Sequence, residues 1–439
     1  MQVIATITLA DLSEVSTVSD TLVISAGLPD QDSFTVSATV LNPGGANING
    51  VESTITIQAA DAFNNPVPDG TPISFTTEYG AVDPSCATTD GACTVTWNSQ
   101  NPKAVLLSST GTMRTIDNTA CDWDNDGPDG DDTTGDPCFQ ASNEYPLGQI
   151  YSGRTTILAY ALGDESFVDS NGNGFYDYVD TNGNVTYDAG VDTLEPFVDL
   201  PEAFRDDNED GVFGNDTSNF DNNGDGACTS DDGRDQCSGW ETGGAEEEFI
   251  DLDVDFSYDA DQDGDTANDS VGNGIFNGVL CVEELELLDL CSTESVNVRD
   301  ETVVSMSGST PVIDFRSSAA SFAPLVGDSM DVSGGAGSVV VYISDFQNGY
   351  LANGSTINIT ADNCDLAGDG TYTVGNTSAS RFTRITLGLA EDEEMVITAG
   401  AVTVTVISTI TTGAGNTTEV ESQAPFLLSA NLSPEPLCH

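Results

Sequence analysis

The chain has 439 residues, and its nine Lys and Arg against 73 Asp and Glu give a formal net charge of -64. Because phosphate binding needs clustered basic side chains, this balance excludes nucleic acids and anionic membrane surfaces as partners. Gly, Thr, Ser, Val and Asn dominate and helical patterns are scarce. We therefore expect an all-β fold of two or three domains.

The N-terminal segment, residues 1–20, contains one expected strand with no obvious hairpin partner. Its apolar side chains alternate with others at Val3, Ala5, Ile7 and Leu9. The strand, residues 2–10, could be the first strand of its own domain or the tail of a preceding one. It could also be a donor strand that pairs with the open edge of a neighbouring subunit.

From Thr21 onward, short strands follow at regular spacing with turn residues between them. The run 61–80 holds a polar turn, a Gly-Thr step and an alternating strand that ends in glycine. This run recurs 284 positions later without a gap, so that Asp345 aligns with Asp61. The chain here resembles bacterial Ig-like domains of the invasin and intimin type. The resemblance implies two β-sandwiches of one kind.

The expected domains are Ig-like domain 1 over residues 21–310 and Ig-like domain 2 over residues 311–439. Domain 1 carries two insertions, at 114–147 and 165–280. The insertions depart from the simple pattern of such domains, so they argue against a purely passive spacer.

The second insertion is organised around repeated acidic loops. Its first loop starts at Asp169 and places oxygen side chains at loop positions 1, 3, 5, 9 and 12, with glycine at position 6. This is the ligand spacing of a calcium loop, in which glycine permits the sharp turn. Similar cores recur along both insertions, and a weaker one has Val185 in place of glycine. The candidate calcium ligands are Asp122, Asp124, Asp126, Asp169, Asn171, Asn173, Asp177, Asp180, Asn182, Asn184, Asp188, Asp206, Asn208, Asp210, Asp221, Asn223, Asp225, Asp232, Asp259, Asp261 and Asp263.

Charge supports the interpretation of these loops as cation sites. One such hexapeptide could be an ordinary surface turn, and the acidity could be the solvating surface of a halophile's protein. Residues 165–280, however, carry 31 Asp and Glu against two Arg, and they would repel one another into disorder without counter-charge. We therefore expect several bound Ca²⁺ ions, with dissociation constants of about 0.1 to 1 mM.

The Asp-x-Asn-x-Asp-Gly cores resemble the isolated calcium loops of dockerin and thrombospondin type 3 repeats. The flanks lack the helical periodicity of EF-hands, and position 12 lacks the bidentate Glu of that motif. Asp251, Asp253 and Asp255 alternate with apolar residues, as in a strand with one acidic face. That face is either solvated or a further set of calcium ligands.

Eight of the ten cysteines fall in four close sequential pairs, and Cys364 and Cys438 are left over. The even number favours disulfides and an oxidising compartment, although the connectivity does not follow from sequence alone. Zinc sites are disfavoured because there is no Cys-x-x-Cys, and the single histidine is His439. Residues 1–15 do not read as a signal peptide, and no apolar run predicts a membrane-spanning helix. We therefore expect the numbering to begin after processing or within a longer chain. The expected pairs are Cys86 with Cys93, Cys121 with Cys138, Cys228 with Cys237, Cys281 with Cys291, and Cys364 with Cys438.

No catalytic arrangement stands out, because acyl-transfer sites need an internal histidine and phosphate loops need their lysine. Two functions are consistent with the sequence. The first is a calcium-stabilised extracellular Ig-like subunit that assembles into a surface fibre or filament, with self-assembly or neighbouring Ig-like domains as partners. The second is a monomeric adhesin or stalk fragment that binds a receptor or glycan. Deletion of residues 2–10 would abolish assembly in the first case and leave binding intact in the second.

Overall fold

The computed structural model confirms a largely β molecule with antiparallel sheets. In the part it describes, helix is confined to α1 (Glu283–Glu286) and the 3-10 turn η1 (Gln31–Ser33). No helix there is long and apolar enough to cross a membrane. The described residues are 4–8, 14–18, 27–103, 153–207, 209, 211, 213, 247–252, 258, 273–318, 321–324, 329–330, 337–345, 349–362, 365–379, 383–390 and 400–428.

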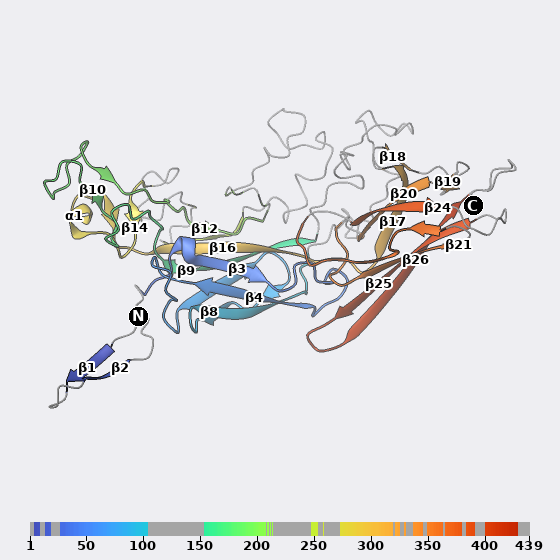
Figure 1. Ribbon diagram of the computed structural model, residues 1–439, viewed down its shortest axis with the longest axis horizontal. Helices are drawn as coiled ribbons and strands as arrows, with labels where there is room; N and C mark the ends of the chain where they lie inside the picture. The colour runs from blue at the N-terminus through green and yellow to red at the C-terminus, as the bar shows by residue number, and fades with distance from the viewer. Residues whose placement is uncertain are drawn as a thin grey trace.

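The first unit consists of two four-stranded antiparallel sheets (Figure 1). One has the order β3 (Phe34–Ala38), β4 (Glu52–Ala59), β8 (Ala92–Asn98), β6 (Ala81–Val82). The other has the order β16 (Val296–Ser305), β9 (Arg154–Gly163), β5 (Pro72–Thr77), β7 (Ser85–Ala87).

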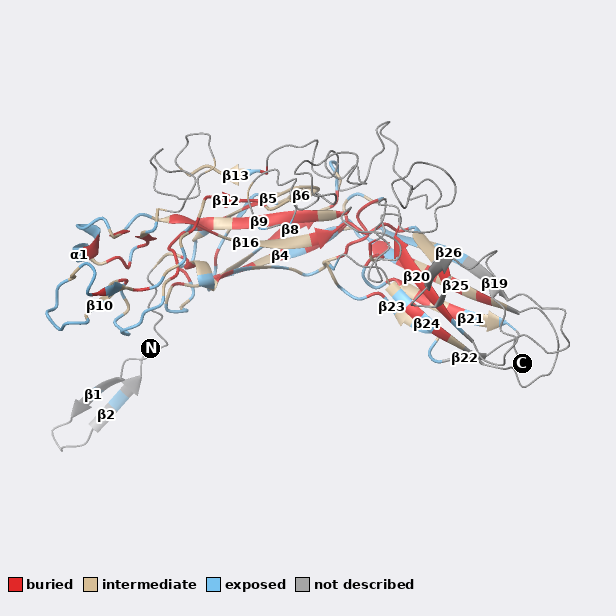
Figure 2. Ribbon diagram, turned by 90° about the horizontal axis from the view of Figure 1, so that it is seen from above, coloured by how far each residue is buried: buried red, intermediate tan, exposed pale blue. Residues whose placement is uncertain are grey.

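The core of the first unit lies between its two sheets. Alternate side chains of a strand lie on opposite faces of the sheet. In β4, Ile55 and Ile57 are accordingly buried while their neighbours are more exposed. They share one apolar cluster with Ile73 of β5 and Ile157 of β9 in the facing sheet. Figure 2 shows this burial as red bands along β4, β8 and β9.

The second unit consists of two five-stranded sheets. One has the order β18 (Ser321–Pro324), β17 (Pro311–Ser318), β20 (Gly337–Asp345), β24 (Thr383–Ala390), β22 (Asp365–Ala367). The other has the order β19 (Ser329–Met330), β26 (Thr417–Leu428), β25 (Gly400–Thr411), β21 (Thr356–Asp362), β23 (Thr371–Thr373). A second apolar cluster, with Val341, Ile357 and Val404, fills the space between these sheets.

The two units share one strand order once β18 and β19 are set aside. β20 then occupies the place of β4, and β21 that of β5. The aligned residues Asp61 and Asp345 also make matching backbone hydrogen bonds. The N–H of Asp61 donates to the carbonyl of Asn65 at 2.8 Å, and that of Asp345 to the carbonyl of Gly349 at 2.9 Å. The repeat seen in the sequence therefore has the same local structure in both places.

A buried asparagine joins the two units. Asn42 is fully buried, and its Nδ2 donates to the carbonyls of Leu351 (2.9 Å) and Gly375 (3.1 Å). Its Oδ1 accepts the N–H of Thr377 at 3.1 Å. A small apolar cluster of Val51, Ala352 and Ile410, with Ile48 packed against it, lies at the same junction. The units are thus connected by directional bonds as well as by the chain.

The N-terminal strand has a hairpin partner, contrary to the sequence-based expectation. β1 (Ile4–Thr8) pairs antiparallel with β2 (Glu14–Val18), with Ile4 opposite Val18 and Thr8 opposite Glu14. The partner was missed because Glu14–Val18 has only Val15 and Val18 as strongly apolar residues. Figure 1 shows this hairpin standing away from the first unit.

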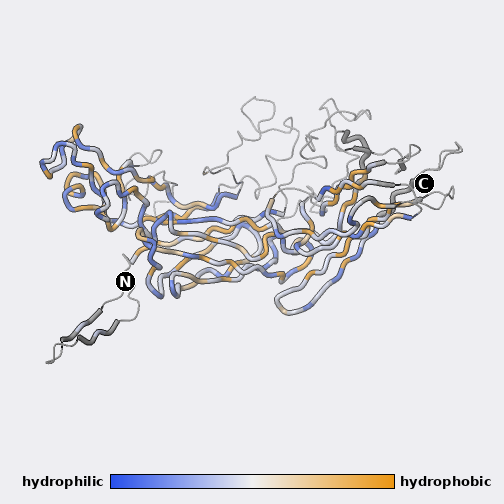
Figure 3. The backbone as a smooth tube through the Cα atoms, in the orientation of Figure 1, coloured by the Kyte–Doolittle hydropathy of each residue, from blue (hydrophilic) through white to orange (hydrophobic). Residues whose placement is uncertain are grey.

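The 165–280 insertion leaves the first unit after β9 and returns at β16. Its described elements are short: β10 (Tyr178–Val179), β11 (Thr193–Leu194), β12 (Ala203–Phe204), β13 (Phe249–Ile250) and β14 (Phe276–Asn277), followed by α1 and β15 (Cys291–Ser292). Figure 3 shows hydrophilic residues along the loops around β10.

Candidate metal site

The loop after Val168 wraps its backbone around one carboxylate. Asp169 accepts the backbone N–H groups of Gly172 (2.6 Å), Asn173 (3.2 Å) and Gly174 (2.8 Å). Gly174 has φ 81°, a left-handed conformation that glycine adopts without steric penalty. The loop's own backbone therefore holds the side chain at loop position 1.

Three further side chains of this loop converge. Nδ2 of Asn171 donates to Oδ1 of Asp177 at 2.8 Å, and Nδ2 of Asn173 donates to Oδ2 of Asp177 at 2.6 Å. These are loop positions 3, 5 and 9, which point inward in a calcium loop. Oδ1 of Asn171 accepts the N–H of Asn173 at 2.9 Å, and Oδ1 of Asn173 accepts the N–H of Phe175 at 2.8 Å, so both amides also hold the loop backbone.

The loop that begins at Asp180 repeats this arrangement. Asp180 accepts the N–H of Val185 at 2.8 Å, just as Asp169 accepts that of Gly174. Nδ2 of Asn182 and of Asn184 both donate to Asp188, at 2.7 and 2.6 Å. The two loops thus share one framework.

Two details distinguish this second loop. Asp180 is expected from the sequence both at position 12 of the first loop and at the start of the second, and its carboxylate accepts hydrogen bonds from the backbone of the second loop. The N–H of Val185 is the main cause that lowers the pKa of Asp180. Val185 itself has φ 65°, so the loop closes without glycine by placing a β-branched residue in the left-handed region.

Each loop is closed by a buried carboxylate that the sequence reasoning missed. Oε1 of Glu195 accepts the N–H of Ser170 at 2.6 Å, and its Oε2 accepts that of Asp177 at 3.3 Å. In the second loop, Oδ1 of Asp192 accepts the N–H of Thr181 at 2.9 Å. Asp192 Oδ2 also accepts the N–H of Asp188 at 2.8 Å. In sequence, Glu195 and Asp192 follow the loops that they close, and both lie outside the twelve-residue calcium-loop window.

The loop at Asp206 shows the same two contacts in its described residues. The N–H of Gly211 donates to Oδ2 of Asp206 at 2.7 Å, and the N–H of Asp207 donates to Oε1 of the buried Glu247 at 3.1 Å. The other predicted ligands lie outside the described residues: Asp122, Asp124, Asp126, Asn208, Asp210, Asp221, Asn223, Asp225, Asp232, Asp259, Asp261 and Asp263.

The donor set fits a hard cation. Each described loop offers carboxylate and amide oxygens and no nitrogen or sulfur ligand, which suits Ca²⁺ rather than zinc. No three His, Cys, Asp or Glu side chains come together as a metal cluster in the described ranges. Asn supplies two of the converging groups in each complete loop, so that acidic side chains alone would not complete a site. Asp169, Asn171, Asn173 and Asp177 would hold an ion in the first loop, and Asp180, Asn182, Asn184 and Asp188 in the second.

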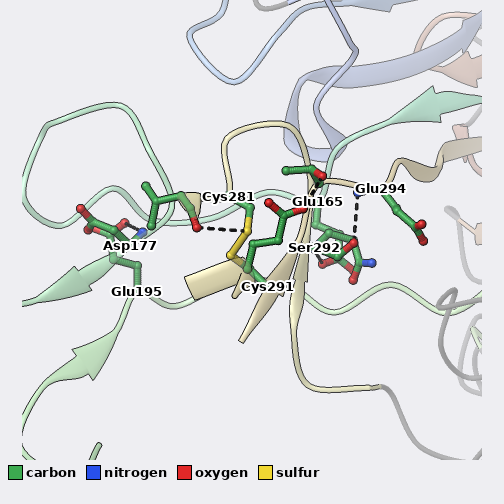
Figure 4. Close-up of a disulfide and its surroundings, with 11 residues drawn as sticks. Glu165, Asp177, Glu195, Cys281, Cys291, Ser292 and Glu294 are labelled. Carbon is green, nitrogen blue, oxygen red and sulfur yellow. Dashed lines mark hydrogen bonds between the residues drawn. A yellow bond between two sulfur atoms is a disulfide. The ribbon is translucent and has the colours of Figure 1, made fainter. Parts of the chain in front are cut away.

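A disulfide and a cluster of aromatic rings support the loops. Cys281 is bonded to Cys291, and both belong to a buried cluster with Tyr176, Phe276 and Leu285. Figure 4 shows the disulfide with Asp177 and Glu195 to one side of it and Glu165 to the other.

The second described disulfide, Cys86–Cys93, joins the edge strand β7 of one sheet to β8 of the facing sheet in the first unit. Both bonds were expected from the spacing of the cysteines. The remaining expected pairs lie outside the described residues: Cys121 with Cys138, Cys228 with Cys237, and Cys364 with Cys438.

Comparison with known proteins assigns no family. No protein-family model matches the chain, and no curated protein gives a significant match. Among solved structures, the Yersinia pseudotuberculosis adhesin InvE aligns at 9% identity with a TM-score of 0.20. That alignment covers 90% of this chain, which spans 60% of the length of InvE.

Two further structures align at similar levels. The Ca²⁺-stabilised adhesin with which an Antarctic bacterium binds ice aligns at 12% identity and a TM-score of 0.16, over 98% of this chain and 81% of that one. The native conformation of E. coli alpha-2-macroglobulin aligns at 10% identity and a TM-score of 0.14, over 98% of this chain and 25% of that one. Similarity at these TM-scores is too low to define a shared fold.

Proposed function

We propose that this chain is a non-enzymatic extracellular structural protein, a calcium-stabilised rod segment of a surface fibre or filament. The observation that carries the proposal is the common framework of the Asp169 and Asp180 loops. In both loops, backbone N–H groups bind the first carboxylate, and two amides converge on the ninth residue. A framework that recurs in such detail is unexpected for unrelated surface turns.

The two units would be Ig-like β-sandwiches, over residues 21–310 and 311–439. Their shared strand order and separate cores support this assignment. The bonds of Asn42 across the junction support a stiff connection between them. The two described disulfides support an oxidising, extracellular location. The lack of a histidine other than His439 supports a non-enzymatic role.

Assembly by strand addition remains part of the proposal, with a changed donor. Because β1 is paired with β2, the hairpin rather than a lone strand would add to a neighbouring sheet. Removal of residues 1–20 is then expected to abolish assembly and to leave calcium binding unchanged.

Electron microscopy of the full chain in 2 mM calcium and in chelator tests the fibre. Ordered fibres in calcium that are lost on removal of residues 1–20 support it. Dispersed rods under both conditions would instead favour a monomeric adhesin or stalk that binds a receptor or glycan. Calcium binding is measured separately by titration calorimetry, and the absence of binding heat at 2 mM calcium would contradict the proposed sites.

A further inference from the structure

Four segments of the insertion share one sequence pattern, Glu-x-Phe-x-Asp. Each places a glutamate four residues before an aspartate and a phenylalanine two residues before it. The segments are Glu165–Asp169, Glu195–Asp199, Glu202–Asp206 and Glu247–Asp251. In the structure they form two antiparallel pairs. The first pair has Phe167 opposite Phe197, and the second has Phe204 opposite Phe249.

Within the first pair, each glutamate closes the turn that follows the partner's aspartate. Glu195 accepts the N–H of Ser170, the residue after Asp169, at 2.6 Å. Glu165 accepts the N–H of Leu200, the residue after Asp199, at 2.8 Å. Both glutamates are nearly fully buried, so both contacts are shielded from water.

The second pair repeats the exchange. Glu247 accepts the N–H of Asp207 at 3.1 Å, and Glu202 accepts the N–H of Leu252 at 2.7 Å. Glu202 and Glu247 are again buried. Four glutamates on four strands therefore make the same contact, always with the partner segment.

In the first pair, one half contains Asp199. This half is assembled from two distant stretches of chain, residues 199–200 and residues 273–277. The N–H of Gly274 donates to Asp199 at 2.8 Å, as the N–H of Gly174 does to Asp169. The N–H of Asn277 donates to Oε2 of Glu165 at 2.7 Å, as that of Asp177 does to Glu195. The second pair lies in sequence between these two stretches, so it is inserted into the first pair.

Aromatic rings connect the two halves of each pair. Tyr176, from the Asp169 loop, stacks on Phe276 with ring centroids 4.4 Å apart and planes 18° apart. In the second pair, Phe213 stacks on Tyr258 at 3.8 Å and 18°. In both pairs the phenylalanines of the strands pack edge-on against these stacks, which is a favourable aromatic geometry.

We propose that the insertion contains two reciprocal loop pairs, in which each half takes its closing carboxylate from the other, so that cation binding at one loop orders both halves of its pair. The inference rests on the calcium binding proposed above. Glu165, Glu195, Glu202 and Glu247 act as positioning residues. Because neither half contains its own closing carboxylate, a loop whose partner strand is displaced loses that contact.

Hydrogen exchange of the full chain, followed by mass spectrometry with and without 2 mM calcium, tests the coupling. The decisive variant is Glu165→Gln, because Glu165 bonds to Leu200 and Asn277 in the Asp199 half and to no residue of the Asp169 loop. We expect exchange in calcium to become about tenfold faster in residues 169–177 as well as in 199–200 and 273–277, because Gln keeps one acceptor oxygen for two N–H groups and so loses one buried hydrogen bond. Glu294→Gln makes the same substitution at an exposed neighbour (Figure 4) and should change neither region.

The variant Ser170→Pro tests the coupling from the Asp169 half to the Asp199 half. It removes the N–H that Glu195 accepts and leaves every glutamate in place. Faster exchange in residues 273–277 of this variant is expected. Effects confined to the mutated half in both variants would overturn the coupling. Exchange in the sheets of the first unit shows in each case whether the variant is folded. If the wild-type protein shows no calcium-dependent protection at all, the proposed calcium sites fail, which is a different result from independent halves.

Discussion

At the scale of single residues, Val185 shows how the framework can tolerate the wrong side chain. It occupies the position that glycine holds in the first loop, with φ 65° and a side chain 79% exposed. A β-branched residue in this region carries steric strain of about 1–3 kcal/mol. Val185→Gly is therefore expected to stabilise the protein by about 1 kcal/mol in chemical denaturation, with part of the strain relief offset by glycine's chain entropy. Val191→Gly, at an exposed valine without positive φ, should be neutral or destabilising. Equal gains from both variants would argue against strain.

The carboxyl group of Asp30 predicts how the stability of the protein depends on pH. Burial raises its pKa to about 6, against the hydrogen bonds from Ser166 and Asp32 that lower it. The folded protein therefore holds this proton more tightly than the unfolded chain. The resulting stability is fully present below about pH 3.8 and is lost as pH rises through about 6. In chelator, Asp30→Asn should flatten the fall in melting temperature between pH 5 and 7. An unchanged slope would show that Asp30 does not titrate in this range.

At the scale of elements, the junction between the units depends on Asn42. Its side chain makes three hydrogen bonds to the second unit from a fully buried position. Asn42→Ala leaves buried backbone groups unpaired, at a cost of about 1–3 kcal/mol. Calorimetry should then show the melting transitions of the two units moving apart. Asn47→Ala, at a nearby exposed position, is the matched control and should leave the thermogram unchanged.

At the scale of the whole molecule, the net charge of -64 makes stability depend on how the charge is neutralised. Monovalent salt screens charges over about 8 Å at physiological ionic strength, but it does not occupy a loop. A bound ion stabilises the folded state according to its concentration relative to its dissociation constant. Chelation should thus lower the melting temperature, and added calcium should restore it where isoionic sodium chloride does not. If sodium chloride restored the melting temperature fully, general charge screening would explain the effect and specific calcium sites would not be needed.

Much of the fold was predictable from local pattern. The alternating strand expected after the Gly-Thr step of the run 61–80 is β5, because period-two burial is a property of the strand itself. The repeat around Asp61 and Asp345 was visible for the same reason. β2 was missed because its pattern is weak and its pairing with β1 is a contact between segments.

The sequence by itself determined the loops, the oxygen side chains at their predicted ligand positions and the alternating strands, since each depends on residues within about a dozen positions of one another. Only the tertiary structure decided which residues close the loops. Glu195 closes the Asp169 loop by accepting the N–H of Ser170. Glu165 accepts the N–H of Asn277, which lies 112 positions further along the chain. Such contacts are set by the pairing of distant strands and the stacking of Tyr176 on Phe276. The physical reason is that a backbone N–H donates to any carboxylate brought within reach, so spacing along the chain does not specify which carboxylate closes the loop.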